Sequence, residues 1–266
     1  MFDLKSMFTC TRASAGSTWL RCIFTRIENR LRFLSVVLAG IFLLTACETI
    51  DSKQSKYFSF STHKAKSPSP TVIVAHGCDG PGLWTEDWRK RVVDWGYNAV
   101  VVDQFSKRGF PSGVCNRGAM VPPDERNQDI GELIDWIKTQ SWHSGEVALI
   151  GMSHGGAVAI DAAINANTYG RLKAAVALYP GCMNIRYNYE NPKIPVQVHL
   201  GKQDSWTPCL SSNWSNYELY VYENAGHSFD IDRPKRQYAG YTLWYDKEAT
   251  TLSQDRIKGF LAKHLQ

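Results

Sequence analysis

A hydrophobic run long enough to cross a bilayer is missing from this 266-residue sequence. The apolar run 33–44 covers only about 12 residues, whereas a transmembrane helix needs about 20. Two arginines, Arg30 and Arg32, precede this run, and small residues lead from it to Cys47. A basic flank, a short apolar run and a small-residue exit are typical of a secretory signal. We therefore predict that residues 1–46 are a leader that is removed on export.

The end of this leader reads Leu44-Thr45-Ala46-Cys47 and resembles the lipobox of bacterial lipoproteins. The resemblance implies that Cys47 receives a diacylglycerol, becomes the first residue of the mature protein and anchors it in the bacterial cell envelope. A plain signal peptide or a buried strand is the alternative interpretation. The segment 47–69 that follows is polar, with alternating Ser and Pro near its end, so it is predicted to be a tether.

A strong net charge is also absent once the leader is set aside. The formal charge of the whole chain is +5, but the leader contains six Lys and Arg against two Asp and Glu. The remaining chain has 24 basic and 23 acidic side chains, so no basic surface for nucleic acid follows. Its 220 residues suit one domain with a sizeable core, which we place at 70–266.

From residue 71 onward, short apolar runs alternate with segments of helical spacing. Strands are predicted at 71–75, 98–103, 147–150, 174–179, 196–200 and 218–222, and helices at 85–95, 124–140, 156–163 and 251–265. An additional edge strand is predicted at 57–61. Apolar strands that alternate with helices indicate the α/β class, with a mostly parallel sheet covered on both faces. Ligands of such sheets bind beyond the carboxyl ends of the strands.

The third of these central strands leads into Gly151-Met152-Ser153-His154-Gly155, which has the pattern Gly-x-Ser-x-Gly. A small, apolar helix is predicted directly after it. A strand, a sharp turn with serine at its apex and a helix form the nucleophile elbow of the α/β-hydrolase fold. The glycines permit a strained turn, because side chains at their positions would clash with the neighbouring strand and helix. We therefore predict Ser153 as a nucleophile, although the short pattern also occurs by chance.

An acid and a histidine follow Ser153 in the order that this fold requires. Asp204 lies in the loop after the fifth central strand, and His227 lies in the loop after the sixth. Imidazole titrates near neutral pH and can accept the serine proton, and a carboxylate fixes the tautomer of the ring. Asp230 and Asp232 are weaker candidates for the acid, because they follow the histidine closely. The prediction is a triad of Ser153, Asp204 and His227.

A tetrahedral intermediate needs backbone N–H groups aimed at its oxyanion. The amide of His154 directly follows the predicted nucleophile and lies at the start of a helix. The loop after the first central strand, His76-Gly77-Cys78-Asp79-Gly80, is predicted to provide the second donor, the amide of Cys78. A plain glycine turn is the alternative interpretation of this loop.

Six short motifs together resemble the dienelactone hydrolase family. They run in order along 70–265: Val74 to Gly77, Asp103 to Gly109, Gly151 to Gly155, Tyr179 to Gly181, Asp204 to Pro208 and Gly226 to Phe229. The resemblance implies hydrolysis of a small-molecule ester or lactone through an acyl-enzyme, without cofactor or metal. The namesake enzymes of the family use Cys as the nucleophile. Ser153 places this sequence with the serine-type, esterase-like members.

Three residues beside the predicted triad are candidates for substrate binding. Arg108 follows the second central strand, where its guanidinium is suited either to pair with a substrate carboxylate or to hold its own long loop in place. Trp206 and Tyr179 are candidates for an apolar pocket wall, and packing is the alternative interpretation for both.

Four cysteines lie outside the leader and Cys47, and all four follow strand ends. An even number in an oxidising compartment favours two disulfides, for which three connectivities exist. We predict Cys78–Cys115 and Cys182–Cys209, because each pair joins loops from neighbouring strands. The absence of a C-x-x-C pattern or clustered histidines argues against a metal site.

Two functions of different classes follow from these observations. The first is an envelope-anchored serine hydrolase that acts on a small ester or lactone, and the second is a non-catalytic lipoprotein that uses the same scaffold for binding. A short-peptide serine peptidase is a further alternative. The intact Ser–Asp–His order favours the first. The sequence carries no signal for an oligomeric state.

Overall fold

The computed structural model describes residues 55–115, 121–165, 168, 170–182 and 191–265. The predicted leader, the predicted lipidation site Cys47 and the first part of the predicted tether lie outside these residues. None of the helices in the described part of the chain has the length and apolar character that are needed to cross a bilayer.

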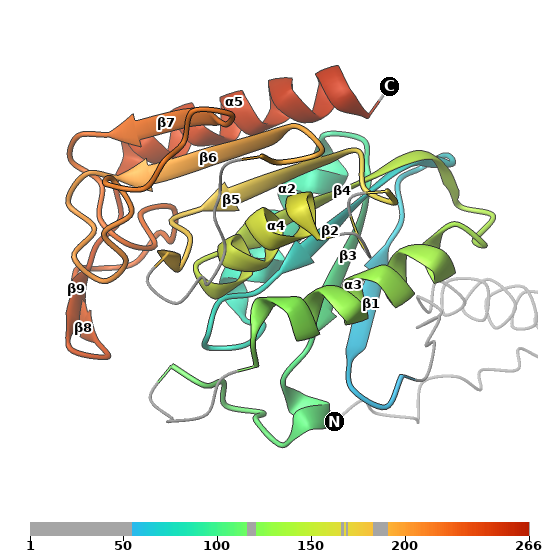
Figure 1. Ribbon diagram of the computed structural model, residues 1–266, viewed down its shortest axis with the longest axis horizontal. Coiled ribbons are helices and arrows are strands. Elements are labelled where there is room, and N and C mark those ends of the chain that lie inside the picture. Colours follow the sequence, from blue (N-terminus) through green and yellow to red (C-terminus); the bar gives the residue numbers. More distant parts are fainter. Residues whose placement is uncertain (1–54, 116–120, 166–167, 169, 183–190, 266) are drawn as a thin grey trace, which may run out of the picture. The chain divides into compact units, whose positions relative to one another are not determined.

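A seven-stranded sheet forms the centre of the described part (Figure 1). Its spatial order is β1–β3–β2–β4–β5–β6–β7, and only β1 runs antiparallel to its neighbour. The predicted mostly parallel sheet and its edge strand are therefore confirmed. The strands are β1 (Ser59–His63), β2 (Ser69–Ala75), β3 (Asn98–Asp103), β4 (His143–Met152), β5 (Ala174–Leu178), β6 (Val196–Gly201) and β7 (Glu218–Tyr222).

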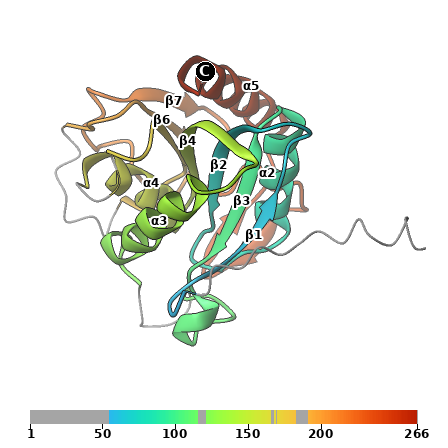
Figure 2. The ribbon, with the colours of Figure 1, turned by 90° about the vertical axis from the view of Figure 1, so that its right-hand side faces the viewer.

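Helices cover both faces of the sheet, as predicted. Figure 2 shows α3 (Pro123–Ile137) and α4 (His154–Ile164) on one face, and α2 (Leu83–Asp94) and α5 (Lys247–His264) on the other. Successive side chains of a strand point to opposite faces. In β2, Ile73 accordingly belongs to the core under α3 and α4, and Val72 and Val74 belong to the core under α2 and α5. Burial on both faces explains why the strand sequences are nearly continuous apolar runs.

All four helices begin earlier than the sequence predicts, and α2 and α5 show the local reason. Helix α2 begins at Leu83 and not at residue 85, and the Thr85 hydroxyl oxygen accepts a hydrogen bond from the Gly82 backbone N–H at 3.0 Å. Helix α5 begins at Lys247 and not at residue 251, because the Asp246 carboxylate accepts a hydrogen bond from the Ala249 backbone N–H at 2.8 Å. This bond caps the first turn.

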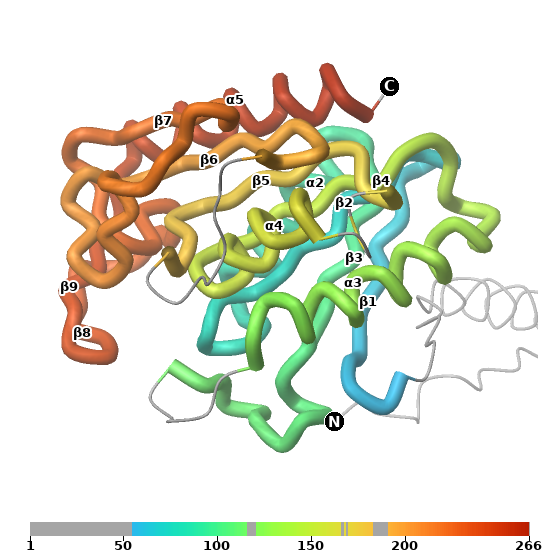
Figure 3. Tube along the Cα trace, viewed as in Figure 1, coloured from blue at the N-terminus to red at the C-terminus, as the bar shows by residue number. Residues whose placement is uncertain are grey.

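A small antiparallel hairpin is missing from the sequence-based prediction. It consists of β8 (Arg236–Tyr238) and β9 (Tyr241–Leu243). Strands of three residues are too short for an alternating pattern to be recognised. Figure 3 shows the hairpin beyond the carboxyl ends of β5, β6 and β7. It therefore lies at the carboxyl ends of the strands, where ligands of parallel sheets bind.

A buried amide side chain joins three segments at the amino ends of the central strands, opposite the hairpin. Asn98 is the first residue of β3, and its Nδ2 donates to the carbonyl oxygens of Ser69 at 2.6 Å and Trp142 at 3.0 Å. Its Oδ1 accepts from the Ala65 backbone N–H at 2.9 Å. One side chain at the start of β3 thus bonds to backbone groups before β2, at the first residue of β2 and before β4.

We predict that Asn98→Ala lowers the free energy of unfolding by about 2–3 kcal/mol, because the three hydrogen bonds of this buried side chain to backbone groups are lost. Urea denaturation of the purified protein measures this value. The matched control is Asn224→Ala, which removes the same side chain from an exposed position. Equal stability of the two variants would contradict the prediction.

Candidate active site

Ser153 lies between β4 and α4 in a strained backbone conformation. Its φ of 54° is in the left-handed region, which is unfavourable for residues with a Cβ. A Cβ at Gly151 would overlap the backbone of Gly155, and a Cβ at Gly155 would overlap the carbonyl oxygens of Ala75 and His76. The pattern Gly-x-Ser-x-Gly therefore has the steric reason that the sequence predicts.

The three predicted triad residues lie in hydrogen-bond contact, although they come from three different loops. His227 Nε2 lies 2.9 Å from Ser153 Oγ, and His227 Nδ1 lies 2.8 Å from Asp204 Oδ2. His227 and Asp204 are buried. An ionised carboxylate only accepts hydrogen bonds, so its contact assigns the proton of the neutral ring to Nδ1. Nε2 is then free to accept the Ser153 hydroxyl proton.

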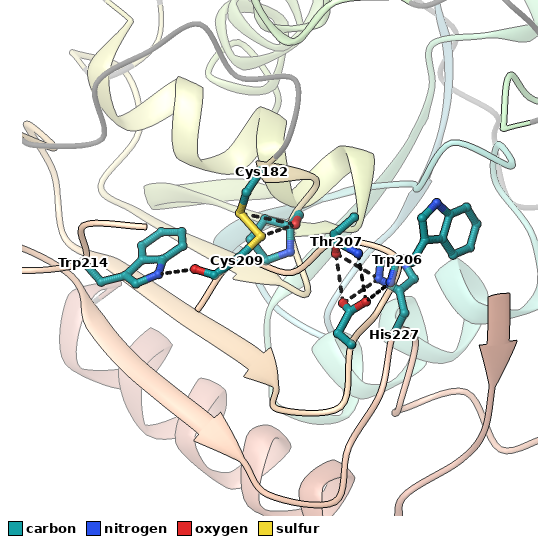
Figure 4. Close-up of a disulfide and its surroundings, with 8 residues drawn as sticks. Cys182, Trp206, Thr207, Cys209, Trp214 and His227 are labelled. Carbon is teal, nitrogen blue, oxygen red and sulfur yellow. Dashed lines mark hydrogen bonds and ion pairs between the residues drawn. A yellow bond between two sulfur atoms is a disulfide. The ribbon is translucent and has the colours of Figure 1, made fainter. Parts of the chain in front are cut away.

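The Asp204 carboxylate is held by its own loop. Its Oδ1 accepts hydrogen bonds from the backbone N–H groups of Trp206 and Thr207, both at 2.9 Å. The Thr207 hydroxyl donates to Asp204 Oδ2 at 2.9 Å and lies 3.1 Å from His227 Nδ1 (Figure 4). These bonds fix the orientation of the carboxylate. Thr207 carries no motif of its own in the sequence, although its place three residues after Asp204 is typical of such a local bond.

Tyr179 does not form a pocket wall, which corrects one interpretation of the sequence. It is buried behind His227, with ring centroids 4.9 Å apart, and its hydroxyl donates to Asp230 Oδ1 at 2.7 Å. Trp88 Nε1 donates to Asp230 Oδ2 at 2.7 Å. Both carboxylate oxygens of Asp230 are thus occupied away from the histidine. Burial, followed by the charge of Asp230, raises the pKa of Tyr179 well above its ordinary value, so its hydroxyl remains a donor.

Arg108 does not face the predicted triad, so its assignment to substrate binding is wrong. Its guanidinium forms a bidentate pair with Asp129, at 2.8 and 3.1 Å, and Nε donates to Glu125 at 3.0 Å. It also donates to the carbonyl oxygens of Tyr57 and Gln104. Arg108 therefore holds its own loop against α3, which is the structural alternative that the sequence leaves open.

A buried arginine orients the side chain of His154 away from Ser153. Arg126 on α3 is fully buried, and its Nη1 lies 2.6 Å from His154 Nδ1. Its other nitrogens donate to Gln104 Oε1 at 2.7 Å and to the His76 carbonyl at 3.0 Å. Burial, followed by the charge of Arg126, lowers the pKa of His154 well below its ordinary value, so the ring is neutral. The sequence gives no sign of Arg126, because a single basic residue on a helix usually faces solvent.

Both predicted disulfides are present. Cys78–Cys115 joins the loop after β2 to the loop before α3, and the Val114 backbone N–H donates to the Cys78 carbonyl at 2.6 Å. Gly113 has a φ of +75° and packs so closely on Cys78 and Asp79 that a Cβ would lie 2.6 Å from their backbone atoms. The predicted oxyanion loop is therefore fixed by a covalent bond and by close packing.

The second disulfide, Cys182–Cys209, fixes the loop that follows Asp204 (Figure 4). Cys209 is buried, and its carbonyl accepts a hydrogen bond from Trp214 Nε1 at 2.9 Å. The disulfide connects the loop after Asp204 to the segment that follows β5. A cross-link so close to Asp204 limits the movement of the Asp204 loop relative to the sheet.

A pocket of about 390 Å³ opens onto Ser153 and His227. Trp206 lines it, as the sequence predicts, and its ring is stacked on Tyr241 at 5.1 Å. The hairpin β8–β9 and the segment before it contribute a large part of the wall. The remaining lining residues are Cys78, Asp79, Trp84, Ser112, Cys115, Ser228, Ile231, Arg233, Arg236, Tyr238 and Leu243.

The sheet order, the strained Ser153 turn and the contacts of His227 define the α/β-hydrolase fold. Solved structures with this fold resemble the chain. A putative dienelactone hydrolase from Klebsiella pneumoniae gives a TM-score of 0.60 at 20% identity, and the match covers 81% of this chain and 96% of that chain. An esterase from Pyrococcus furiosus gives a TM-score of 0.55 at 18% identity, with coverages of 79% and 88%.

Sequence comparison identifies the family. The model of the dienelactone hydrolase family matches residues 58–265. A carboxymethylenebutenolidase from Pseudomonas putida is 26% identical over 224 residues, and the match covers 74% of this chain and 87% of that protein. The chain therefore belongs to the dienelactone hydrolase family and is a hydrolase, which confirms the resemblance of its six motifs.

Asp79 lines the pocket, and the pKa of its carboxyl is shifted. Burial raises the pKa of its carboxyl from 3.8 to about 6, although its own backbone N–H and the charges of His227 and Arg236 act in the opposite direction. The folded protein therefore holds this proton more tightly than the unfolded chain. The resulting contribution to stability is fully present below about pH 4 and is lost as the pH rises through 6.

We predict that Asp79→Asn raises the free energy of unfolding at pH 8 by about 2–3 kcal/mol, because the variant no longer buries an ionised carboxylate. The difference from the native protein should shrink as the pH is lowered toward 4. Urea denaturation at a series of pH values measures both quantities. Asp232→Asn, an exposed position that does not line the pocket, is the control. A difference that does not vary with pH would contradict the prediction.

Proposed function

We propose that this hydrolase cleaves a small carboxylic ester or lactone through an acyl-enzyme on Ser153. The observation that carries the proposal is the continuous hydrogen-bonded chain from Asp204 through His227 to Ser153 Oγ. It ends in a pocket of about 390 Å³, a size that suits small molecules. The name of the carboxymethylenebutenolidase relative and the family description support the same reaction class.

Each step of the proposed reaction uses a group in this chain. His227 Nε2 accepts the proton of Ser153 as Oγ attacks the carbonyl carbon, and Asp204 stabilises the imidazolium that forms. The amides of Cys78 and His154 are the proposed donors to the oxyanion. When the tetrahedral intermediate collapses, the leaving oxygen takes the proton from Nε2 and the acyl group remains on Oγ. Water then repeats the attack, His227 accepts its proton, and collapse returns that proton to Ser153 as the acid leaves.

We predict that a fluorophosphonate probe labels the purified, oxidised protein on Ser153. Ser153→Ala removes the nucleophile and should abolish labelling. His227→Ala removes the base, so the labelling rate should fall by roughly 10³-fold or more. Mass spectrometry of the intact protein and of its peptides identifies the labelled residue.

The matched control for this experiment is Ser211→Ala, which changes an exposed serine outside the pocket and should be labelled at the native rate. Short-chain aryl esters then test for turnover. Failure of the folded native protein to react with the probe would exclude an activated serine and would favour a binding role for the pocket.

We further propose that the protein is exported and held by a lipid on Cys47 at the membrane of the bacterial cell envelope. The lipobox-like sequence before Cys47 supports this location. The two disulfides support it independently, because disulfides persist in oxidising compartments and are rare in the cytosol of most bacteria.

We predict that Cys47→Ser moves the protein from the membrane fraction of a bacterial host to the soluble fraction, because the diacylglycerol has no thiol to attach to. Metabolic labelling with an alkyne fatty acid detects the lipid directly. Substitution of Cys22, which lies within the predicted leader, is the control and should leave the lipid in place. Incorporation of lipid into the Cys47→Ser protein would contradict the proposal.

A further inference from the structure

The carboxylate of Asp79 lies beside the predicted nucleophile, with only a glycine between them. A Cβ at Gly77 would be 3.0 Å from Asp79 Oδ1 and 3.5 Å from Ser153 Cβ. The missing side chain of Gly77 therefore leaves one space that both groups border. Asp79 also lines the pocket together with Ser153 and His227. The pocket space next to Ser153 is therefore also space next to this carboxylate.

The carboxylate has no side-chain partner among the described residues, in the form of either a hydrogen bond or an ion pair. The groups that face it are His227, Arg236 of β8, and the rings of Tyr179 and Tyr238. Arg236 acts on it through space, and Arg236 Nη1 is itself buried without a hydrogen-bond partner in the described structure. A largely buried carboxylate without a side-chain partner destabilises a fold, and a ligand that supplies such a partner explains its presence.

The position of the ionised Asp79 carboxylate is unfavourable for the hydrolysis of an ester that carries no cation. Hydrolysis at Ser153 develops a negative oxyanion at the neighbouring amides, and an ionised Asp79 opposes that charge. A protonated amine in the acyl group would pair with Asp79 and remove the opposition. The rings of Trp84, Trp206 and Tyr238 line the same pocket, and aromatic faces also attract organic cations.

Two arginines in the pocket make the role of Asp79 more specific. Arg233 lies over the Trp84 ring at 5.9 Å, and Arg236 lines the pocket from the hairpin. Both guanidinium groups repel an ammonium group, and Coulomb interactions weaken with distance. An ammonium group is therefore favoured only where it lies next to Asp79, which is beside the scissile bond.

We propose that Asp79 is a specificity-determining residue that selects esters whose acyl group carries a protonated amine close to the scissile carbonyl. This inference rests on the proposed ester hydrolysis at Ser153. It assigns the class of acyl group and leaves the reaction itself unchanged.

The test compares two esters of 4-nitrophenol that differ by one group. The β-alanine ester carries an ammonium where the butyrate ester carries a methyl group, so the two acyl chains have nearly the same shape. The kcat/KM ratio of the charged ester to the neutral ester reports the effect of the charge. We expect Asp79→Asn to lower this ratio by about tenfold, because it removes one close charge pair. An unchanged ratio would overturn the inference.

The pH dependence of the same ratio provides a second measurement in the native protein. As the pH falls from about 7.5 to 5, Asp79 takes up a proton while the amine remains charged, so the ratio should fall. Both esters react through the same triad, so any pH dependence of the triad itself cancels in the ratio. A ratio that is constant over this range would overturn the inference even if Asp79→Asn failed to fold. Asp232→Asn is the matched control and should retain the native ratio.

The outcomes separate this inference from the proposed function. If neither ester is hydrolysed in a Ser153-dependent manner, the proposed function fails. If both are hydrolysed and the ratio responds neither to Asp79→Asn nor to pH, the proposed function stands and the role of Asp79 is wrong.

Discussion

The strained turn at Ser153 is the constraint on which the rest of the site depends. Its backbone is held on both sides of the residue, because the Ser153 N–H donates to the Leu178 carbonyl at 2.9 Å and the Ser153 carbonyl accepts from Gly181 at 3.0 Å. These bonds connect the turn to the end of β5. Only a rigid, fully paired surrounding can maintain an unfavourable φ, so the sheet is a necessary part of the nucleophile's geometry.

The polar groups behind the site are arranged so that each has a defined orientation. Asp230 receives hydrogen bonds from Trp88 and Tyr179, and Tyr179 in turn packs on the ring of His227. On the other side, Arg126 holds His154. Buried polar groups are costly unless they are paired, and a paired network allows few alternative arrangements. The networks thus fix His227 and the start of α4 without touching the pocket.

The wall of the pocket differs from these paired networks, because some of its polar groups lack side-chain partners in the described structure. Its wall includes an Asp79 carboxylate without a side-chain partner and an Arg236 nitrogen without a hydrogen-bond partner in the described structure, next to two disulfide-linked loops. Asp79 and Arg236 reduce stability and line the pocket. The loops around them are held by disulfides and by close packing. Such a division is expected when a site is selected for binding and the scaffold is selected for rigidity.

The sequence by itself determined the order of the main strands and helices, the elbow around Ser153 and the order of Asp204 and His227, and it favoured the two cysteine pairs that the structure contains. These features depend on local spacing, on steric rules for glycine and on which loops leave the same edge of a parallel sheet. Only the tertiary structure decided where side chains point. It turned Arg108 toward Asp129, buried Tyr179 behind His227 and brought the short hairpin β8–β9 over the pocket. Side-chain direction depends on partners from distant segments, and three-residue strands carry no periodic pattern, so neither can be obtained from local sequence.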